Sequence, residues 1–213
     1  GAGGAASAAA ASAAAKPAAP SAKTGEGAPS MATMLVAWIC LWVATGVDGT
    51  VGPVVTLAVC ALLPLAQVRR RLCAYDRISL GLVGGFAALM LLTGLVGPLY
   101  VASYAAFGAL WLVSCATPEP LCAAYVKYGY GGDDALANPI FMRANRILAM
   151  AWGVLYLLIA LWTALLGGMV AGWVLPVVNN VATALMGVFT VWFERRYPAW
   201  VASGKGLREL FFG

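Results

Sequence analysis

Polar residues inside long apolar stretches are the first candidates for chemistry in this chain. Asn179, Asn180 and Thr183 form such a group, and Asn179 and Thr183 share a helix face because they are four residues apart. Amide and hydroxyl groups at membrane depth either line a small cavity or hydrogen-bond across helices, and the second use is commoner. Ionisable residues, which mark ion paths in membranes, occur only near the ends of the apolar stretches. This pattern disfavours an ion-driven transporter or pump.

Catalytic and metal-binding side chains are scarce. The chain has no histidine, which removes histidine acid–base chemistry, histidine metal centres and bis-histidine haem ligation. Its five cysteines are irregularly spaced, and most are expected to be small core residues. Cys115 and Cys122 lie near the end of an apolar stretch, but they lack the tight paired spacing typical of a metal site. With no phosphate loop, triad set or carboxylate pair, the sequence predicts no catalytic residue, metal or cofactor, and a protein that is not an enzyme.

The composition indicates an integral membrane protein. Hydrophobic residues make up 62% of the chain and charged residues 10%, whereas about a quarter of the residues of a soluble domain are charged. The net charge of +5 would suggest nucleic acid as a partner of a soluble domain. Here the cations flank the apolar stretches, where membrane topology and anionic lipid explain them. We therefore expect the lipid bilayer as a partner, with anionic lipid at the cytoplasmic face, and no nucleic acid.

The uncharged stretches define the elements that position these residues. They are 27–47, 49–68, 78–118 and 147–193. A membrane-spanning helix needs ~20 mostly apolar residues, so the first two stretches hold one helix each and the last two hold a hairpin each. The sequence predicts an all-α fold, a polytopic membrane protein with six transmembrane helices arranged as three hairpins. Pro53, Pro98 and Pro176 are expected in the first turn of each returning helix, where proline is tolerated.

All thirteen Lys and Arg residues can be placed on one side of the membrane by this threading. The three turns on the other side, near 48–52, 96–98 and 167–173, contain no Lys or Arg. Basic loops are retained in the cytoplasm. The distribution therefore predicts a multi-pass protein with both termini in the cytoplasm.

Three regions follow from the composition. Residues 1–30 are rich in Ala, Gly, Ser and Pro and are expected to form a disordered linker. Residues 31–193 form the six-helix transmembrane domain. Residues 194–213 mix cations with aromatic residues, which is typical of an interfacial cytoplasmic tail. Since the chain begins with Gly, the linker also suggests a tether to an upstream domain, with an expression remnant as the simpler alternative.

The start of the fifth helix carries the candidate binding residues. Asn138 and Pro139 resemble an N-cap followed by proline at the first helical position. A helix running from there to about residue 166 would be ~42 Å long, longer than the ~30 Å hydrocarbon core, so its first turns project into the interface. Arg143 and Arg146 share a face of this extension. They are candidates for binding anionic lipid or an acidic partner, and enforcing topology is the simpler alternative.

Small residues spaced four apart predict where helices approach closely. Gly81 with Gly85, and Ala149 with Gly153, form such pairs. We interpret them first as packing seams within one molecule and second as a homodimer face.

The order of features resembles the intracellular septation protein A family. The resemblance rests on three hairpins, a basic loop from Arg69 to Arg77, a polar loop and the opening of the third hairpin. Its residues are Pro118, Pro120, Leu121, Phe141, Asn145, Trp152, Gly153 and Tyr156. The resemblance covers about 35–197 and implies a bacterial inner-membrane protein that supports envelope synthesis and division through partners, without enzymatic activity. It adds Asn145 to the candidate binding residues.

Three functions stay open at this point. The first is a non-catalytic scaffold or partner-binding component in cell-envelope biogenesis or division. The second is a small-molecule or lipid transporter without ion coupling, for which a cavity lined by Asn179 and Thr183 would be the sign. The third is a membrane anchor for an upstream soluble domain.

Overall fold

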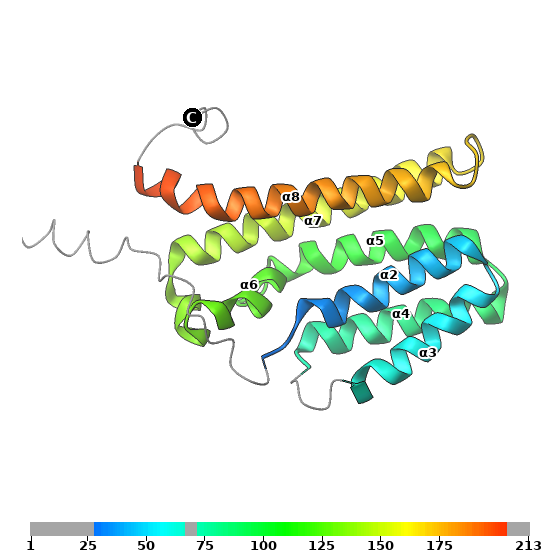
Figure 1. Cartoon of the computed structure of the whole chain (residues 1–213), viewed down its shortest axis with the longest axis horizontal. Coiled ribbons are helices and arrows are strands. Elements are labelled where there is room, and N and C mark those ends of the chain that lie inside the picture. The colour runs from blue at the N-terminus through cyan, green and yellow to red at the C-terminus, as the bar shows by residue number, and fades with distance from the viewer. Residues whose placement is uncertain (1–27, 67–71, 204–213) are drawn as a thin grey trace, which may run out of the picture.

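The computed structural model of the chain describes residues 28–66 and 72–203, and the regular elements of this part are all helices. Six long helices and a short helical block form the fold (Figure 1). The long helices are α2 (Met31–Val47), α3 (Val51–Ala66), α4 (Ala74–Thr93), α5 (Val96–Ser114), α7 (Pro139–Leu166) and α8 (Val174–Ser203). The block comprises α6 (Leu121–Val126), η1 (Lys127–Gly129) and η2 (Gly132–Ala137).

Four of these helices are long and apolar enough to cross a membrane, namely α4, α5, α7 and α8. Helices α2 and α3 are apolar but shorter, with 17 and 16 residues. At 1.5 Å per residue they measure only ~25 Å, slightly less than a typical hydrocarbon core of ~30 Å. The all-α class is therefore confirmed and a membrane protein is indicated, while the crossing of the membrane by α2 and α3 stays a prediction.

The long helices pair as three successive hairpins. Helix α3 packs on α2 and α4, α2 also packs on α4, α5 packs chiefly on α7, and α8 packs on α7. The three hairpin turns lie together at one end of the bundle, and the starts of α4 and α7 and the end of α8 lie at the other (Figure 1). We call this second end the basic end. Its described, exposed arginines are Arg77, Arg143, Arg146, Arg195 and Arg196.

The hairpin turns have the chemistry that the sequence predicted. Pro53, Pro98 and Pro176 each occupy the third position of their helix, which confirms their place in the first turn. In the hairpin turn between α2 and α3, the Asp48 carboxylate accepts hydrogen bonds from the backbone N–H groups of Thr50 and Val51, both at 2.8 Å. These bonds lower the pKa of Asp48 below its usual value. Such a cap satisfies N–H groups that a helix start leaves without partners.

Aromatic side chains fill the centre of the bundle. Trp42 of α2 stacks on Tyr104 of α5 and on Tyr156 of α7, with ring centroids 4.5 and 5.3 Å apart. Phe107 packs against Trp38 and Tyr156 at 4.8 and 4.6 Å. Ring pairs at these distances stabilise a core beyond the area that they bury. The cluster joins the first hairpin to the other two.

Helices α5 and α7 approach each other most closely at Gly108 and Gly153. A Cβ atom on Gly153 would lie 2.6 Å from the Leu112 Cγ atom and 3.0 Å from the Gly108 carbonyl oxygen. This contact confirms that Gly153 belongs to a packing seam. The interpretation of Gly81 and Gly85 as a seam within the molecule is wrong, because a Cβ atom on either would have nothing within 4 Å among the described residues.

The predicted interfacial tail from residue 194 stays a prediction. Its first part belongs to α8, which continues through Pro198 to Ser203. The linker residues 1–27, the arginines at 69–71 and the last part of the tail, 204–213, lie outside the described residues.

Candidate functional site

The start of α7 is built as the sequence predicted. The Asn138 side chain accepts hydrogen bonds from the backbone N–H groups of Ile140, at 2.9 Å, and Phe141, at 3.2 Å. Pro139 occupies the first helical position. The helix then runs without a break to Leu166, so that it has 28 residues. This confirms both predicted ends and provides a rigid support for the residues of its first turns.

The three candidate residues on this extension have different environments. Arg143 and Arg146 are exposed, whereas Asn145 is only 5% exposed. The Asn145 amide donates a 2.8 Å hydrogen bond to the carbonyl oxygen of Phe141 on its own helix. Asn145 therefore supports the local structure of α7, and the two arginines are the side chains of this group that can reach a ligand.

Arg146 of α7 and Arg196 of α8 lie at similar positions along the axis of this helix pair. Trp152 of α7 donates a 3.0 Å hydrogen bond to the Thr190 hydroxyl of α8, which makes these two residues level in the antiparallel pair. Six residues further toward the basic end lie Arg146 on α7 and Arg196 on α8. This is ~9 Å along each helix axis. The basic end therefore carries a layer of exposed guanidinium groups.

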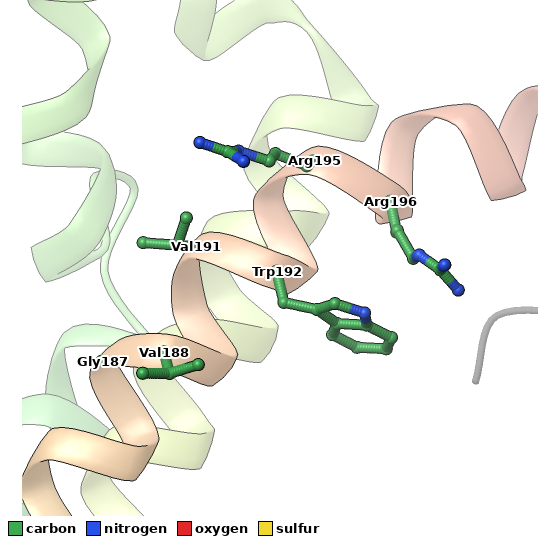
Figure 2. A pocket seen from close by; sticks show the side chains of 6 residues that line it. All are labelled: Gly187, Val188, Val191, Trp192, Arg195 and Arg196. Atoms are coloured by element: carbon green, nitrogen blue, oxygen red, sulfur yellow. The ribbon is translucent and has the colours of Figure 1, made fainter. Parts of the chain in front are cut away.

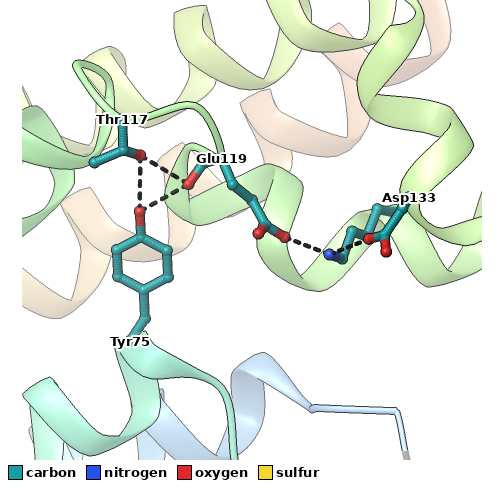
Figure 3. A network of polar contacts seen from close by, with 5 residues as sticks. Tyr75, Thr117, Glu119 and Asp133 are labelled. Atoms are coloured by element: carbon teal, nitrogen blue, oxygen red, sulfur yellow. Dashed lines mark hydrogen bonds and ion pairs between the residues drawn. The ribbon is translucent and has the colours of Figure 1, made fainter.

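A network of polar contacts ties α4 to the segment before α7 (Figure 3). The Tyr75 hydroxyl of α4 donates a 2.7 Å hydrogen bond to the Glu119 carbonyl oxygen and lies 3.1 Å from the Thr117 hydroxyl. The Glu119 carboxylate forms a 2.7 Å ion pair with Lys127, and Lys127 forms a second one, at 2.6 Å, with Asp133. Glu119, Lys127 and Asp133 thus join the loop after α5 to η1 and η2. We call them the Lys127 cluster.

Lys127 is the buried partner of this cluster. Its side chain is 9% exposed, while that of Asp133 is 85% exposed. Desolvation lowers the pKa of Lys127, but the hydrogen bonds to Asp133 and Glu119 outweigh it, so that the pKa is raised. The ammonium group therefore stays charged at neutral pH and anchors the helical block on which α7 begins.

A buried carboxylate, that of Asp76, forms a second group of polar contacts at the same end of the bundle. Asp76 is 1% exposed, and its carboxylate accepts hydrogen bonds from the Tyr125 hydroxyl and from the Cys73 backbone N–H, both at 2.8 Å. Burial raises the pKa of Tyr125, which keeps this hydroxyl protonated as the donor. The bond to Cys73 caps α4, and the bond to Tyr125 fixes α6 against that helix start.

The predicted intramembrane cluster connects α7 to α8. Asn179 is 3% exposed; its side-chain oxygen accepts a 2.7 Å hydrogen bond from the Trp162 indole, and its nitrogen donates one of 3.2 Å to the Thr163 hydroxyl. Thr183 donates to the Asn179 carbonyl oxygen, and Asn180 donates to that of Pro176, both within α8. The interhelical use of Asn179 is therefore confirmed. Thr183 and Asn180 bond to their own helix.

The cysteines take part in packing and local bonds. Cys122 is 5% exposed, and burial raises the pKa of its thiol. The Cys115 thiol lies 3.4 Å from the carbonyl oxygen of Trp111 and 3.7 Å from that of Arg146. The described part of the chain holds no group of three or more His, Cys, Asp or Glu residues placed to bind a metal ion.

Several of these residues escaped prediction. Asp76 and Tyr125 are 49 residues apart, and nothing in either local sequence pairs them. The charge pattern of the sequence indicates Lys127 only as one of the cations that set the membrane topology. The nearby acidic residues Glu119 and Asp133 could have indicated that Lys127 forms ion pairs. Gly108 lacked a small partner at a spacing of four, so only the three-dimensional contact with Gly153 identifies it.

Fold and site together define a membrane protein made of helical hairpins, with a basic layer held by buried polar contacts. A comparison with protein-family models found no match, and neither did searches of curated proteins and of solved structures. The resemblance to the intracellular septation protein A family therefore stays a prediction.

Proposed function

We propose that this chain is a non-catalytic scaffold of the bacterial inner membrane that binds a protein partner at its basic end. The observation that carries the proposal is the exposure of Arg143 and Arg146 on a capped, rigid extension of α7. Both side chains point from a helix that is fixed on two sides, by α5 and by the helical block. The planar guanidinium group forms paired hydrogen bonds with carboxylates. An acidic surface is thus the complementary partner.

The orientation of the chain is part of this proposal. The helix ends that carry the exposed arginines lie opposite the three hairpin turns (Figure 1). Retention of basic loops in the cytoplasm then places the basic end inside. The partner is a cytoplasmic protein or the cytoplasmic part of a membrane protein. The resemblance noted above favours envelope synthesis or division as the process that it serves.

The intramembrane polar cluster favours a scaffold over a transporter. A transporter needs polar groups that face a substrate path near the membrane centre. The Asn179 side chain instead hydrogen-bonds to the neighbouring helix α7: its oxygen accepts from Trp162 and its nitrogen donates to Thr163. This residue stabilises a helix pair, as a scaffold requires.

Charge reversal tests the proposal directly. Arg143→Glu combined with Arg146→Glu should leave membrane insertion and thermal stability unchanged, because both side chains are exposed. The variant should lose the proteins that wild type retains from solubilised membranes, measured by quantitative mass spectrometry. Arg77→Glu is the control, since it places the same kind of change on an exposed residue of the basic end. Equal partner profiles for wild type and the double variant would refute the assignment.

A further inference from the structure

A hollow runs along the outer side of α8 near the basic end. It is lined by Gly187, Val188, Val191, Trp192, Arg195 and Arg196. Its volume is about 530 Å³, many times the ~30 Å³ share of one water molecule. At 3.6 residues per turn, these side chains lie on the side of α8 away from the buried Phe193 and Tyr197. The hollow therefore faces the surroundings of the bundle.

The lining residues form two parallel rows along the helix. Gly187, Val191 and Arg195 form one row at a spacing of four, and Val188, Trp192 and Arg196 form the other. Figure 2 shows Val191 and Arg195 on one side of the helix, with Trp192 and Arg196 on the other. Each row begins with a small or aliphatic residue and ends with an arginine. The hollow is thus apolar at the end near Gly187 and Val188 and cationic at the end near Arg195 and Arg196.

This order matches the membrane along its normal. From Gly187 to Arg195 the helix rises ~12 Å, close to the ~15 Å thickness of one hydrocarbon leaflet, half of the ~30 Å core. Trp192 lies between the aliphatic and the cationic residues, at the level where tryptophan marks the membrane interface. The Arg196 guanidinium lies 5.7 Å from the centre of the Trp192 ring, which orients it. When the valines contact lipid tails, the arginines reach the phosphates.

We propose that this hollow binds an anionic phospholipid, with an acyl chain along the Gly187 row and the phosphate at the end of the hollow that Arg195 and Arg196 line. Guanidinium groups form paired hydrogen bonds with phosphate oxygens. Gly187 supplies the room, because a Cβ atom there would have nothing within 4 Å among the described residues. A second copy of the chain fits less well, since a symmetric contact would bring the same arginine pairs together. The inference does not depend on the proposed partner at Arg143 and Arg146.

Native mass spectrometry of the full chain in mild detergent tests this site. The probes are phosphatidylglycerol and phosphatidylcholine with identical acyl chains. Wild type should retain the anionic lipid preferentially. Arg195→Gln with Arg196→Gln should weaken that retention about 30-fold, the effect of two charges at ~1 kcal/mol each. Gly187→Leu, whose Cβ atom would have nothing within 4 Å among the described residues, should fill part of the hollow and weaken retention of both lipids.

Arg143→Gln with Arg146→Gln is the matched control, since it removes two charges at similar depth from α7. It should retain phosphatidylglycerol as wild type does. Equal loss in this control, or no loss in the α8 double variant, would overturn the proposal. Retention of inorganic phosphate that is unaffected by Gly187→Leu would show a plain anion site instead. A dimer that disappears in Gly187→Leu would identify a second copy as the occupant, and would equally overturn the lipid assignment.

Discussion

Gly108 of α5 and Gly153 of α7 face each other across a close contact between these two helices. A Cβ atom on Gly108 would lie 2.9 Å from the Gly153 carbonyl oxygen, and one on Gly153 would lie 3.0 Å from that of Gly108. A glycine on each helix lets the two backbones approach this closely. The contact sets the spacing between the helix that carries much of the aromatic core and the helix that carries Arg143 and Arg146.

Gly153→Ala should therefore destabilise the protein. The added methyl group would lie 2.6 Å from the Leu112 Cγ atom and 3.0 Å from the Gly108 carbonyl oxygen, so the Leu112 side chain and its surroundings must shift, at a cost of about 1–3 kcal/mol for overpacking. Thermal unfolding of the purified protein in detergent measures the effect. Gly81→Ala is the control, because its methyl group enters open space on α4. Similar melting temperatures for Gly153→Ala and wild type would contradict the seam.

Asn179→Leu should weaken the pairing of α7 with α8. It removes the hydrogen bonds to Trp162 and Thr163 and costs about 1–2 kcal/mol, the range found for such bonds in membranes. Unfolding in a series of denaturing detergent concentrations would measure the loss. Asn180→Leu makes the same chemical change on an exposed residue that bonds to Pro176 of its own helix, and it should be nearly neutral. If both variants lose the same stability, the interhelical bonds are unimportant.

Lys127→Met should loosen the helical block before α7. The lost ion pairs with Glu119 and Asp133 are worth about 1–2 kcal/mol together, since both carboxylates keep contact with water. Because the folded pKa of Lys127 lies above its ordinary value of 10.5, the stabilisation is complete below about pH 10.5. It is lost as the pH rises through the folded pKa. Hydrogen exchange of residues 121–137 should therefore increase in the variant at neutral pH.

The same variant provides a pH control. Wild type should lose protection in this segment as the pH passes above 10.5, while Lys127→Met should show no additional loss there. An equal alkaline response in both proteins would mean that another group controls the segment.

Cysteine accessibility tests the predicted orientation. In a background with the five native cysteines replaced, Asp48→Cys and Val170→Cys should react with an impermeant reagent added outside whole cells, because both lie in the hairpin turns. Arg77→Cys, at the basic end, should react only after the membrane is opened. The reverse labelling would place the basic end outside and remove the proposed cytoplasmic partner.

Local patterns predicted the elements of this protein better than the contacts between them. Asn138 and Pro139 were identified as a helix start because capping depends on adjacent residues. The Asp76 to Tyr125 bond was not predicted, because it joins residues 49 positions apart that only the packed bundle brings together. Asn145 belonged to the candidate binding residues, but its amide bonds to Phe141 one turn earlier. Gly81 and Gly85 had the spacing of a seam, although the buried face of α4 runs through Val83 and Ala87 instead.

Site-specific photo-crosslinking in native membranes tests the central claim, that a protein partner binds at Arg143 and Arg146. A photoreactive residue at position 143 should give a discrete crosslinked protein, and Arg146→Glu in the same chain should abolish it. The control probe replaces Met169, which is 77% exposed in the turn at the opposite end. We predict that this probe does not capture the same protein. Identical products from both positions, or a product at 143 that survives Arg146→Glu, would contradict the account.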